Sequence, residues 1–586
     1  MEILQENWMA RMTRYRSDNL EIDTPEILYI STGEVEAPPF ARATISDVAP
    51  EPGRKNSLTM MDSRFFGEPS GRMVGIDPGF RGAVQTPRIN GVELKTVFSS
   101  DENIEETGEM VPVGDSLLLS REPRRFARFF ANLRGRIGPG KIVYAPGVAD
   151  PINLALLCYF GIDVVDSYGT LVRSSLGQVI ANGRVISAGS EELEKIAGIG
   201  KNPDSRTILR HNLKQLDIEL AVVRDAIRNG TLRQLVELRA RHEAWMIEAL
   251  RYADHDEYKS FEQWTPTFGG AFLASSKESL WRPDIRRYRE RFRERYVPPK
   301  SPEILLLLPC SAKKPYAISK THRMFRDAIW NSGLGSSVHE VIVTSPLGIV
   351  PRELEIVYPA QQYDIPVTGH WDGDERRIAR EMLDCLLAKR RYSHVIAHLD
   401  SEMEFLKEPL SLLGAVHTGG EGVTRRENLE RLTEVLVSIK DKVSRPSWNQ
   451  KMTEEMNALA SFQFGEASRH IMDGAVAKGG FPMIKIFRDG VQLCSLVPEK
   501  GSLSLTLEGG ESLAKSGKFG VEIDDFVPKT NIFAIGVVGA SPEIRIGDEV
   551  YVHHAGDIRA VGSARMNGKS MVALKRGEAV HVRHHR

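Results

Sequence analysis

Apolar runs alternate with amphipathic segments over residues 1–280, and this pattern predicts repeated βα units. Residues 141–146 and 161–167 predict strands, and residues 153–159 predict the helix between them. Residues 209–227 predict a longer helix, because their apolar positions recur in steps of four and three. These positions are Leu209, Leu213, Leu216, Leu220, Val223 and Ile227. The alternation favours a parallel α/β architecture, and the span suits a barrel of about 250 residues.

A helix and a proline-rich segment mark the end of this first region. Residues 282–295 predict an arginine-rich helix with Tyr288, Phe292 and Tyr296 continuing at four-residue spacing on one face. The following segment, residues 297–302, contains three prolines and cannot continue the helix. We therefore predict a domain boundary here.

Three further domains are expected after this boundary. Residues 296–446 predict a central α/β domain, with strands at 304–308, 338–344 and 394–399. Residues 450–515 predict a small α+β domain that begins with a helix and contains a hairpin turning at 488–490. Residues 518–586 carry short alternating runs separated by glycine, which is typical of a small β-barrel.

Length and composition agree with a large multidomain enzyme. The chain has 586 residues, of which 41% are hydrophobic, and it contains four cysteines that are far apart in sequence: Cys158, Cys310, Cys385 and Cys494. This spacing predicts neither a disulfide framework nor a cysteine-rich zinc site. The histidines of residues 581–586 lack a nearby thiol or carboxylate at ligand spacing, so we predict a strand with a basic tail and no bound metal.

No apolar run approaches the roughly 18 residues that a membrane span requires, and the N-terminal residues do not resemble a signal peptide. We expect a cytoplasmic protein. Its net charge is −1, but three segments are basic: residues 121–136, residues 282–295 and the last 36 residues. Such clustering favours a phosphate-backbone partner, although a charged segment is also the usual solvent face of a helix.

Residues 309–322, PCSAKKPYAISKTH, concentrate reactive side chains directly after the apolar run 304–308. They contain one thiol, three lysines, one imidazole and several hydroxyl groups. Ligands of open α/β sheets bind outside the carboxyl ends of the strands, so this loop is the predicted active centre. The alternative is an inert buried thiol beside a solvated turn.

The same loop carries a family resemblance. Cys310-Ser311, Lys314-Pro315-Tyr316, Ser319 and His322 have the spacing of a PCSxxKPYxxSxxH motif, and a second block covers residues 345–369. The chain resembles the archaeosine synthase family, paralogues of tRNA-guanine transglycosylase. The resemblance implies a transglycosylase-like TIM barrel in residues 1–280 and a PUA domain, an RNA-binding β-barrel, at the C-terminus. It also extends, less sharply, over nearly the whole chain.

The resemblance implies addition of an amine to the nitrile of 7-cyano-7-deazaguanine, at position 15 in the D-arm of tRNA. The implied co-substrate is free lysine or glutamine, no cofactor is bound, and a radical-SAM lyase completes the product. We expect tRNA as the main partner, and the sequence leaves a homodimer open. The sequence does not decide which donor is used.

The motif residues suggest two mechanisms. In the first, Cys310 has a pKa lowered by its strand-end position and by Lys313 and Lys314, and its thiolate attacks the nitrile. In the second, the amine attacks directly, and His322 or Lys314 serves as general acid or base. Two sets of residues are expected to bind substrate. Ser311, Tyr316 and Ser319 would orient the base, whereas Arg352, Glu353 and Asp364 would bind the amino acid.

Two alternatives follow from the same resemblance. In GIDVVDS, Asp166 matches the nucleophile position of a transglycosylase, but nothing matches the second carboxylate motif DSGGFQ, and residues 61–66 lack its glycines. We therefore expect the barrel to have lost base exchange, and Asp166 to be either a remnant or a residue that caps the next helix. A transglycosylase and a non-catalytic tRNA-binding subunit remain the alternative functions.

Overall fold

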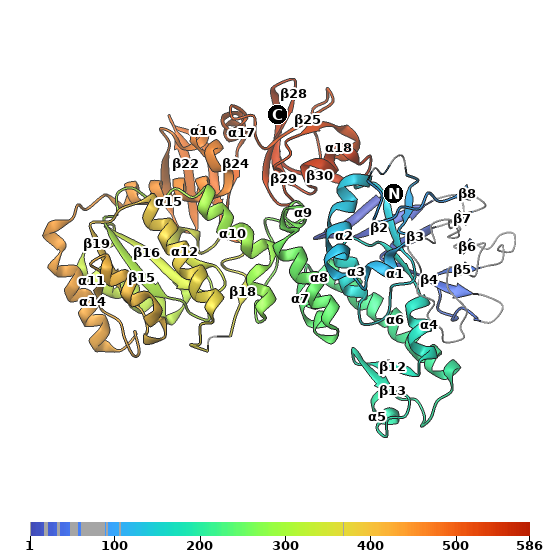
Figure 1. Ribbon diagram of the computed structural model, residues 1–586. Helices are drawn as coiled ribbons and strands as arrows, with labels where there is room; N and C mark the ends of the chain where they lie inside the picture. Colours follow the sequence, from blue (N-terminus) through green and yellow to red (C-terminus); the bar gives the residue numbers. More distant parts are fainter. Residues whose placement is uncertain are drawn as a thin grey trace. The chain divides into compact units, whose positions relative to one another are not determined.

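A computed structural model describes residues 2–16, 21–31, 35–46, 57–59, 88–89, 92–102, 104, 107–366 and 368–586. The chain divides into two compact units. The first comprises Met1–Thr265 with Ala573–Gly577, and the second comprises Pro266–Val572 with Glu578–Arg586 (Figure 1). None of the helices among these residues combines the length and apolarity that a membrane span requires.

The first unit is built on a mixed sheet with the order β8-β7-β6-β5-β4-β11-β10-β9. The strands are β4 (Glu26–Ser31), β5 (Ala43–Ser46), β6 (Ser57–Thr59), β7 (Arg88–Ile89), β8 (Val92–Glu93), β9 (Met110–Pro112), β10 (Ile142–Ala145) and β11 (Val164–Asp166). Strands β9, β10, β11, β4, β5 and β6 run parallel, whereas β7 and β8 form an antiparallel edge.

This strand order is that of a barrel cut at one place. Strands that are neighbours in sequence pair with each other, except for β8 and β9, and β4 also pairs with β11, the last strand of the sheet in chain order. Among the described residues the hydrogen-bonded order stays open between β8 and β9. The α/β class expected for this region is confirmed, and closure into a barrel stays a prediction.

Helices bury the apolar side of this sheet. They include α2 (Pro123–Ile137), α3 (Leu154–Tyr159), α6 (Ser205–Arg228), α7 (Leu232–Arg239) and α8 (Ala244–His255). The predicted stripe of α6 is buried at five positions, and Leu209 is half-buried. Asp204 caps α6 by accepting a hydrogen bond from the Thr207 amide at 2.7 Å. The unit also contains an antiparallel sheet of β1 (Glu2–Asn7), β2 (Ala10–Arg16) and β3 (Glu21–Thr24).

The second unit contains a five-stranded sheet with the order β17-β16-β15-β19-β20. Its strands are β15 (Ile304–Pro309), β16 (Val338–Thr344), β17 (Gly348–Pro351), β19 (His394–Ala397) and β20 (Val416–His417). Strand β15 is central and pairs in parallel with β16 and β19. It is buried on both faces, which explains its continuous apolar run. Helices α11 (Lys320–Ser332), α12 (Gly373–Lys389) and α14 (Arg426–Ser438) follow these strands.

The remaining sheets of this unit share one apolar core with the central sheet. The first of these sheets consists of β21 (Val476–Gly480), β22 (Met483–Arg488), β23 (Val491–Val497) and β24 (Ser502–Leu505). The second, at the C-terminus, includes β25 (Gly520–Ile523), β28 (Glu549–His554), β29 (Asp557–Ala564) and β30 (Glu578–His585). Helix α15 (Trp448–Phe464) connects them, since Leu305, Leu459, Ile486 and Val561 belong to the same buried cluster. The three sheets therefore pack together within the second unit.

The unit boundary lies at Thr265, ahead of residue 280. Strand β14 (Phe272–Leu273) pairs in parallel with β18 (Tyr363–Asp364) and so belongs to the second unit. Helix α10 (Pro283–Glu294) buries Ile285, Tyr288 and Phe292 in the core of that unit. The apolar spacing seen in the sequence is thus a packing face, and the helix is part of the second unit's core.

Candidate active site

The loop of residues 309–322 begins where β15 ends, at the carboxyl edge of the sheet. Pro309 is in register with Val343 of β16, so Cys310 and Thr344 follow side by side on neighbouring parallel strands. The loop then passes through a short 3-10 turn, Tyr316–Ile318, and enters α11. Both strands therefore deliver polar side chains to one edge.

Cys310 is half-buried, and its thiol interacts with the Thr344 hydroxyl. Burial raises the pKa of the Cys310 thiol, although the Thr344 hydrogen bond and the charge of Lys314 oppose this effect. The expectation of a lowered pKa is therefore wrong. The sequence placed cations nearby, but desolvation by the surrounding core outweighs them, and the resting side chain is a thiol.

Lys314 lies beside Cys310 in a half-buried position. Its Nζ is 4.1 Å from the ring centroid of Tyr363 and 5.8 Å from that of Tyr316. Burial lowers the pKa of Lys314, while the charges of Cys310 and Asp364 oppose the shift. A lysine in this setting has a larger neutral fraction at neutral pH than an exposed lysine, and it can accept a proton.

Three hydroxyl groups meet under the thiol. The Tyr316 and Tyr363 hydroxyls lie 2.6 Å apart, and the Thr344 Oγ1 lies 2.6 Å from Tyr363 and 3.1 Å from Tyr316. All three side chains are buried. We call these residues the hydroxyl triangle (Tyr316, Thr344, Tyr363). Through Thr344 it can donate a hydrogen bond to the negative charge that develops on the Cys310 sulfur.

His322 does not have the properties of a general acid. Its side chain is buried, and burial together with the neighbouring Arg352 lowers the pKa of His322 to about 3. Arg352 donates from Nη2 to Nδ1 of His322 across 2.9 Å. The imidazole is therefore neutral, and its place is in a network that anchors the loop.

Arg352 and Glu353 are also committed to internal contacts. Arg352 donates to Glu340 at 2.6 Å and to Glu355 at 2.8 Å, and Glu355 in turn accepts from the Ala317 amide of the loop. Glu353 is buried and accepts from the Tyr296 hydroxyl at 2.6 Å. Arg352 is thus held by two carboxylates, and Glu353 is buried with one carboxylate oxygen bonded and the other without a hydrogen-bond partner, so their role in binding the amino acid stays a prediction.

The other predicted binding residues differ in exposure. Ser319 caps α11, accepting from the His322 amide at 3.1 Å, so its side chain shapes the loop. Ser311 is half-buried and donates to the Lys313 carbonyl at 3.2 Å. Asp364 is exposed at the rim and acts electrostatically on Lys314. Of the predicted amino-acid ligands, only Asp364 is exposed to solvent.

Sequence reasoning missed three residues of this site. Thr344 and Tyr363 complete the hydroxyl triangle, and Glu402 acts electrostatically on Cys310. A Cβ on Gly369, where φ is +76°, would overlap the Glu402 carboxylate, so the loop backbone lies against that side chain. The position of Thr344 at a strand end was the available signal, whereas Glu402 offered none.

Asp166 lies at the carboxyl end of β11 in the first unit. Its buried carboxylate accepts from the Tyr144 hydroxyl at 2.8 Å and from the amides of Gly147 and Tyr168, each at 2.9 Å. Burial raises the pKa of Asp166 to about 6. It thus bonds to the start of the next helix, α4 (Tyr168–Ser175). Residues 61–66, the nearest approach to a second carboxylate motif, lie outside the described residues.

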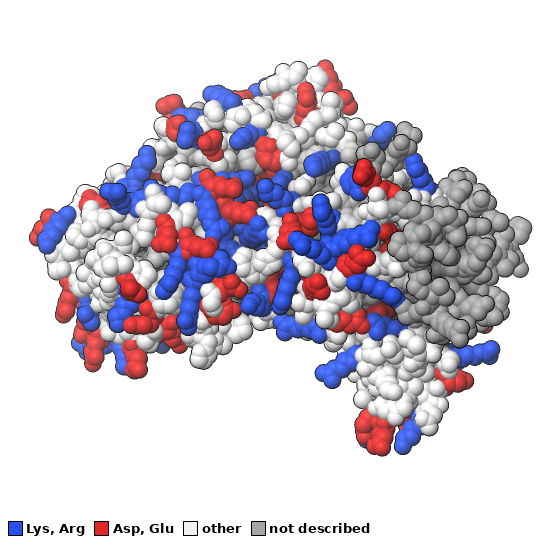
Figure 2. Space-filling view, viewed as in Figure 1, with Lys and Arg blue, Asp and Glu red and all other residues white. Residues whose placement is uncertain are grey.

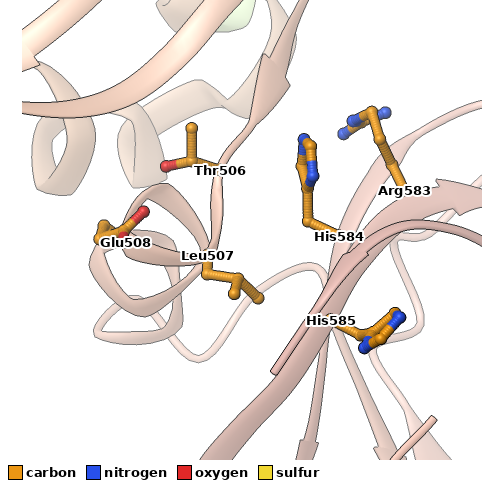
Figure 3. Close-up of a pocket in the computed structure, with 6 residues that line it drawn as sticks. All are labelled: Thr506, Leu507, Glu508, Arg583, His584 and His585. Carbon is orange, nitrogen blue, oxygen red and sulfur yellow. The ribbon is translucent and has the colours of Figure 1, made fainter. Parts of the chain in front are cut away.

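Outside this loop, the described residues offer a pocket but no metal site. In the described parts of the chain, no group of three or more histidine, cysteine, aspartate or glutamate side chains is arranged to hold a metal ion. A pocket of about 400 Å³ lies between α17 (Leu507–Ala514) and β30 and is lined by Arg583, His584 and His585 (Figure 3). Arg583 is already neutralised by Glu549, so the pocket carries little net positive charge.

The basic segments are less available than the sequence indicates. Arg134 is buried against Asp163 at 3.0 Å, and Arg282 is buried against Asp284 at 3.0 Å. Arg287 and Arg289 of α10 are buried as well and donate to backbone carbonyls. On the face drawn in Figure 2, blue and red side chains are intermixed in both units. Much of the predicted positive charge therefore stabilises the fold.

The chain was compared with known proteins. Residues 285–436 match the family described as "Domain of unknown function (DUF5591)", and residues 521–586 match the PUA domain. The chain is 39% identical to "Archaeosine synthase subunit alpha" of Methanosarcina acetivorans over 80% of this chain and 78% of that protein. It is 34% identical to the protein of the same name from Thermoplasma acidophilum, over 82% of this chain and 89% of that protein. It is 24% identical to "tRNA-guanine(15) transglycosylase" of Methanothermobacter thermautotrophicus, over 81% of this chain and 71% of that protein.

Proposed function

The chain belongs to the archaeosine synthase family, and we propose that it adds an amino-acid amine to the nitrile of 7-cyano-7-deazaguanine in tRNA. It is a tRNA-modifying transferase of archaeosine formation. The modified base would be that at position 15 of the D-arm, and the donor would be lysine or glutamine. The proposal rests on the interaction of Cys310 with Lys314 and Thr344 at the carboxyl end of β15.

The first half of the reaction forms a covalent intermediate. The neutral Lys314 amine removes the proton of the Cys310 thiol, and the thiolate adds to the nitrile carbon. One carbon–sulfur bond forms, and one π bond of the nitrile breaks. The nitrile nitrogen then takes the proton from the Lys314 ammonium, which leaves a thioimidate and a neutral lysine. The Thr344 hydrogen bond, which favours the charged form of Cys310, stabilises the thiolate.

The second half releases the product. The neutral amine of the donor adds to the thioimidate carbon, and the carbon–sulfur bond breaks. The proton lost by the amine returns to the thiolate, so the thiol is restored and an amidine remains on the base. No electron transfer is needed. Asp364, exposed at the rim, is suited to bind the ammonium group of the donor that does not react.

Direct attack of the amine on the nitrile is the alternative mechanism, with Lys314 as the general acid. The alternative functions have less support. The Asp166 carboxylate is held by three hydrogen bonds, which argues against its use as a nucleophile in base exchange. A non-catalytic tRNA-binding subunit would not require a lysine of lowered pKa beside a thiol. Two relatives are named "subunit alpha", which supports the presence of a second subunit, and the radical-SAM lyase is the candidate.

The test is incubation of the purified protein with tRNA that carries the nitrile base, adding lysine, glutamine or ammonia one at a time. Nucleoside mass spectrometry should detect a base heavier by the whole donor, since addition to a nitrile expels nothing. Cys310→Ala should form no product, whereas the matched Cys385→Ala variant should retain activity. Product formation by Cys310→Ala at the wild-type rate, or the lack of product with every donor, would contradict the proposal.

A further inference from the structure

We propose that the hairpin of β21 and β22 is a second RNA-binding surface, where an unpaired base of the tRNA stacks on Phe481 and phosphates bind Lys478 and Lys485. This hairpin face (Val476, Lys478, Phe481, Met483 and Lys485) belongs to the sheet whose strand β22 is labelled in Figure 1. The tRNA partner rests on the proposed function. The surface itself rests on the observations below.

The alternation along β22 separates a core face from an open face. Ile484 and Ile486 point into the shared core of the second unit, whereas Met483 and Lys485 are exposed. On β21, Ala477 is buried while Val476 and Lys478 are exposed. One face of the hairpin therefore holds the fold together, and the other is open to solvent.

Two lysines stand directly opposite each other on the open face. Lys478 and Lys485 are cross-strand partners, and among the described residues no carboxylate forms an ion pair with either. Like charges at directly opposite positions destabilise a sheet. The Lys478 Nζ is also 5.2 Å from the ring centroid of Phe487. An anion bound between the two ammonium groups would relieve their repulsion.

The turn adds an aromatic ring to this charge pair. Phe481 is 64% exposed in the turn, and Met483 beside it is 76% exposed. A Cβ on Gly479, where φ is +100°, would collide with the Met483 carbonyl oxygen, so the two strands approach each other closely just before the turn that carries Phe481. Aromatic rings next to cations are the usual platform for single-stranded nucleic acid, because every base has a face that can stack.

Charge complementarity favours RNA over a second copy of this chain. Two copies meeting through this face would bring four lysines together, whereas a polyanion is attracted to them. Arg488, at the other end of β22, donates to the Ser512 hydroxyl at 2.7 Å and is a further positive charge on this strand. The unpaired bases and phosphates of a tRNA loop supply both chemistries that the face offers.

The test measures binding of unmodified tRNA to the full chain by fluorescence anisotropy, without donor and in the Cys310→Ala background. Phe481→Ala should weaken binding at least about fivefold, as loss of one stacked base does. Lys478→Glu with Lys485→Glu should weaken binding and lower the slope of log K against log salt by roughly 0.7–0.9 per lost phosphate contact. Lys300→Glu and Leu412→Ala are controls, because both residues are exposed elsewhere in the same unit.

The same hairpin substitutions are also made in protein that keeps Cys310. There, amine addition at saturating nitrile-bearing tRNA should stay within about twofold of wild type. Phe481→Leu, which keeps an apolar side chain without the ring, guards against a folding defect and should also weaken binding. Unchanged affinity and salt slope in both the Phe481 and the lysine variants would overturn the proposal. Altered sedimentation of those variants with unchanged tRNA affinity would also overturn it, in favour of self-association. These binding data decide the proposal even if wild type shows no amine addition.

Discussion

Arg352 donates from Nη2 to Nδ1 of His322 across 2.9 Å, so the remaining imidazole hydrogen is on Nε2. The same guanidinium binds Glu340 and Glu355, and Glu355 accepts from the Ala317 amide in the loop. The histidine of the PCSxxKPYxxSxxH motif is thus a positioning residue. It connects the first turn of α11 to the residues that follow β17.

The stability of the protein should depend on pH through His322. The pKa of this imidazole is lowered to about 3 in the folded state, below its ordinary value of 6.5, so the unfolded chain binds the proton first as pH falls. The contribution of the neutral imidazole to the free energy of unfolding is fully present above pH 6.5. It is lost as pH falls from 6.5 to about 3, by at most about 1.4 kcal/mol per pH unit. Urea unfolding of His322→Gln should show a flatter pH dependence, whereas exposed His370→Gln should match wild type.

Cys310→Ala and Lys314→Met should each lower amine addition by at least about 100-fold while leaving tRNA affinity within about twofold. The reason is that the thiol and its proton acceptor act on the base, whereas binding uses other surfaces. With donor withheld, intact mass spectrometry should trap a covalent adduct of wild-type protein with tRNA, and this adduct should be missing in Cys310→Ala. Turnover without a trapped adduct under several quench conditions would favour direct attack by the amine.

The reactivity of the Cys310 thiol should report on Thr344. Because burial raises the pKa of the thiol, alkylation by iodoacetamide should have its pH midpoint above the ordinary thiol value of about 8.5. Thr344→Val removes the hydrogen bond that favours the thiolate, so the midpoint should move higher still. Thr344→Ser should restore it. Measurements in a Cys385→Ala background remove the other half-buried thiol. A midpoint below 8.5 in wild type would contradict this account.

Asp166→Asn should leave amine addition to nitrile-bearing tRNA within about threefold of wild type, since that reaction does not touch the glycosidic bond. Asp163→Asn provides a contrast, because Asp163 pairs with the buried guanidinium groups of Arg11 and Arg134. Breaking this network should destabilise the fold by about 3–5 kcal/mol, measured by urea unfolding. Exchange of labelled guanine by wild type, lost in Asp166→Asn, would instead support a transglycosylase.

The C-terminal domain should contribute affinity rather than chemistry. Truncation near residue 518 would also remove Tyr551, Ile558 and Val561 from the shared core, so charge reversal is the sharper test. Lys569→Glu with Lys575→Glu, both exposed, should weaken tRNA binding and flatten its salt dependence. Catalysis at saturating tRNA should stay within about twofold. If the slope of log K against log salt equals that of the Lys300→Glu control, Lys569 and Lys575 make no phosphate contact.

Local pattern was sufficient for the secondary structure and for the position of the loop. The strand predicted at 304–308 is β15, the apolar stripe of 209–227 is the buried side of α6, and the hairpin around 488–490 joins β22 to β23. These features depend on side-chain periodicity and turn residues, which act over a few positions. Placing Cys310 at a strand end needed no more than that.

The roles of individual polar residues depended on the tertiary structure. The sequence by itself determined that a thiol, lysines and an imidazole emerge together after a buried strand. It did not determine that Arg352 and Glu353 are engaged with partners distant in the chain, that Arg134 and Arg282 are buried, or that Cys310 is desolvated. Burial and pairing arise from residues far apart in sequence, and they set both the pKa of a group and whether it is free to bind. Only the folded chain therefore decided that Lys314 has its pKa lowered beside a thiol whose pKa is raised.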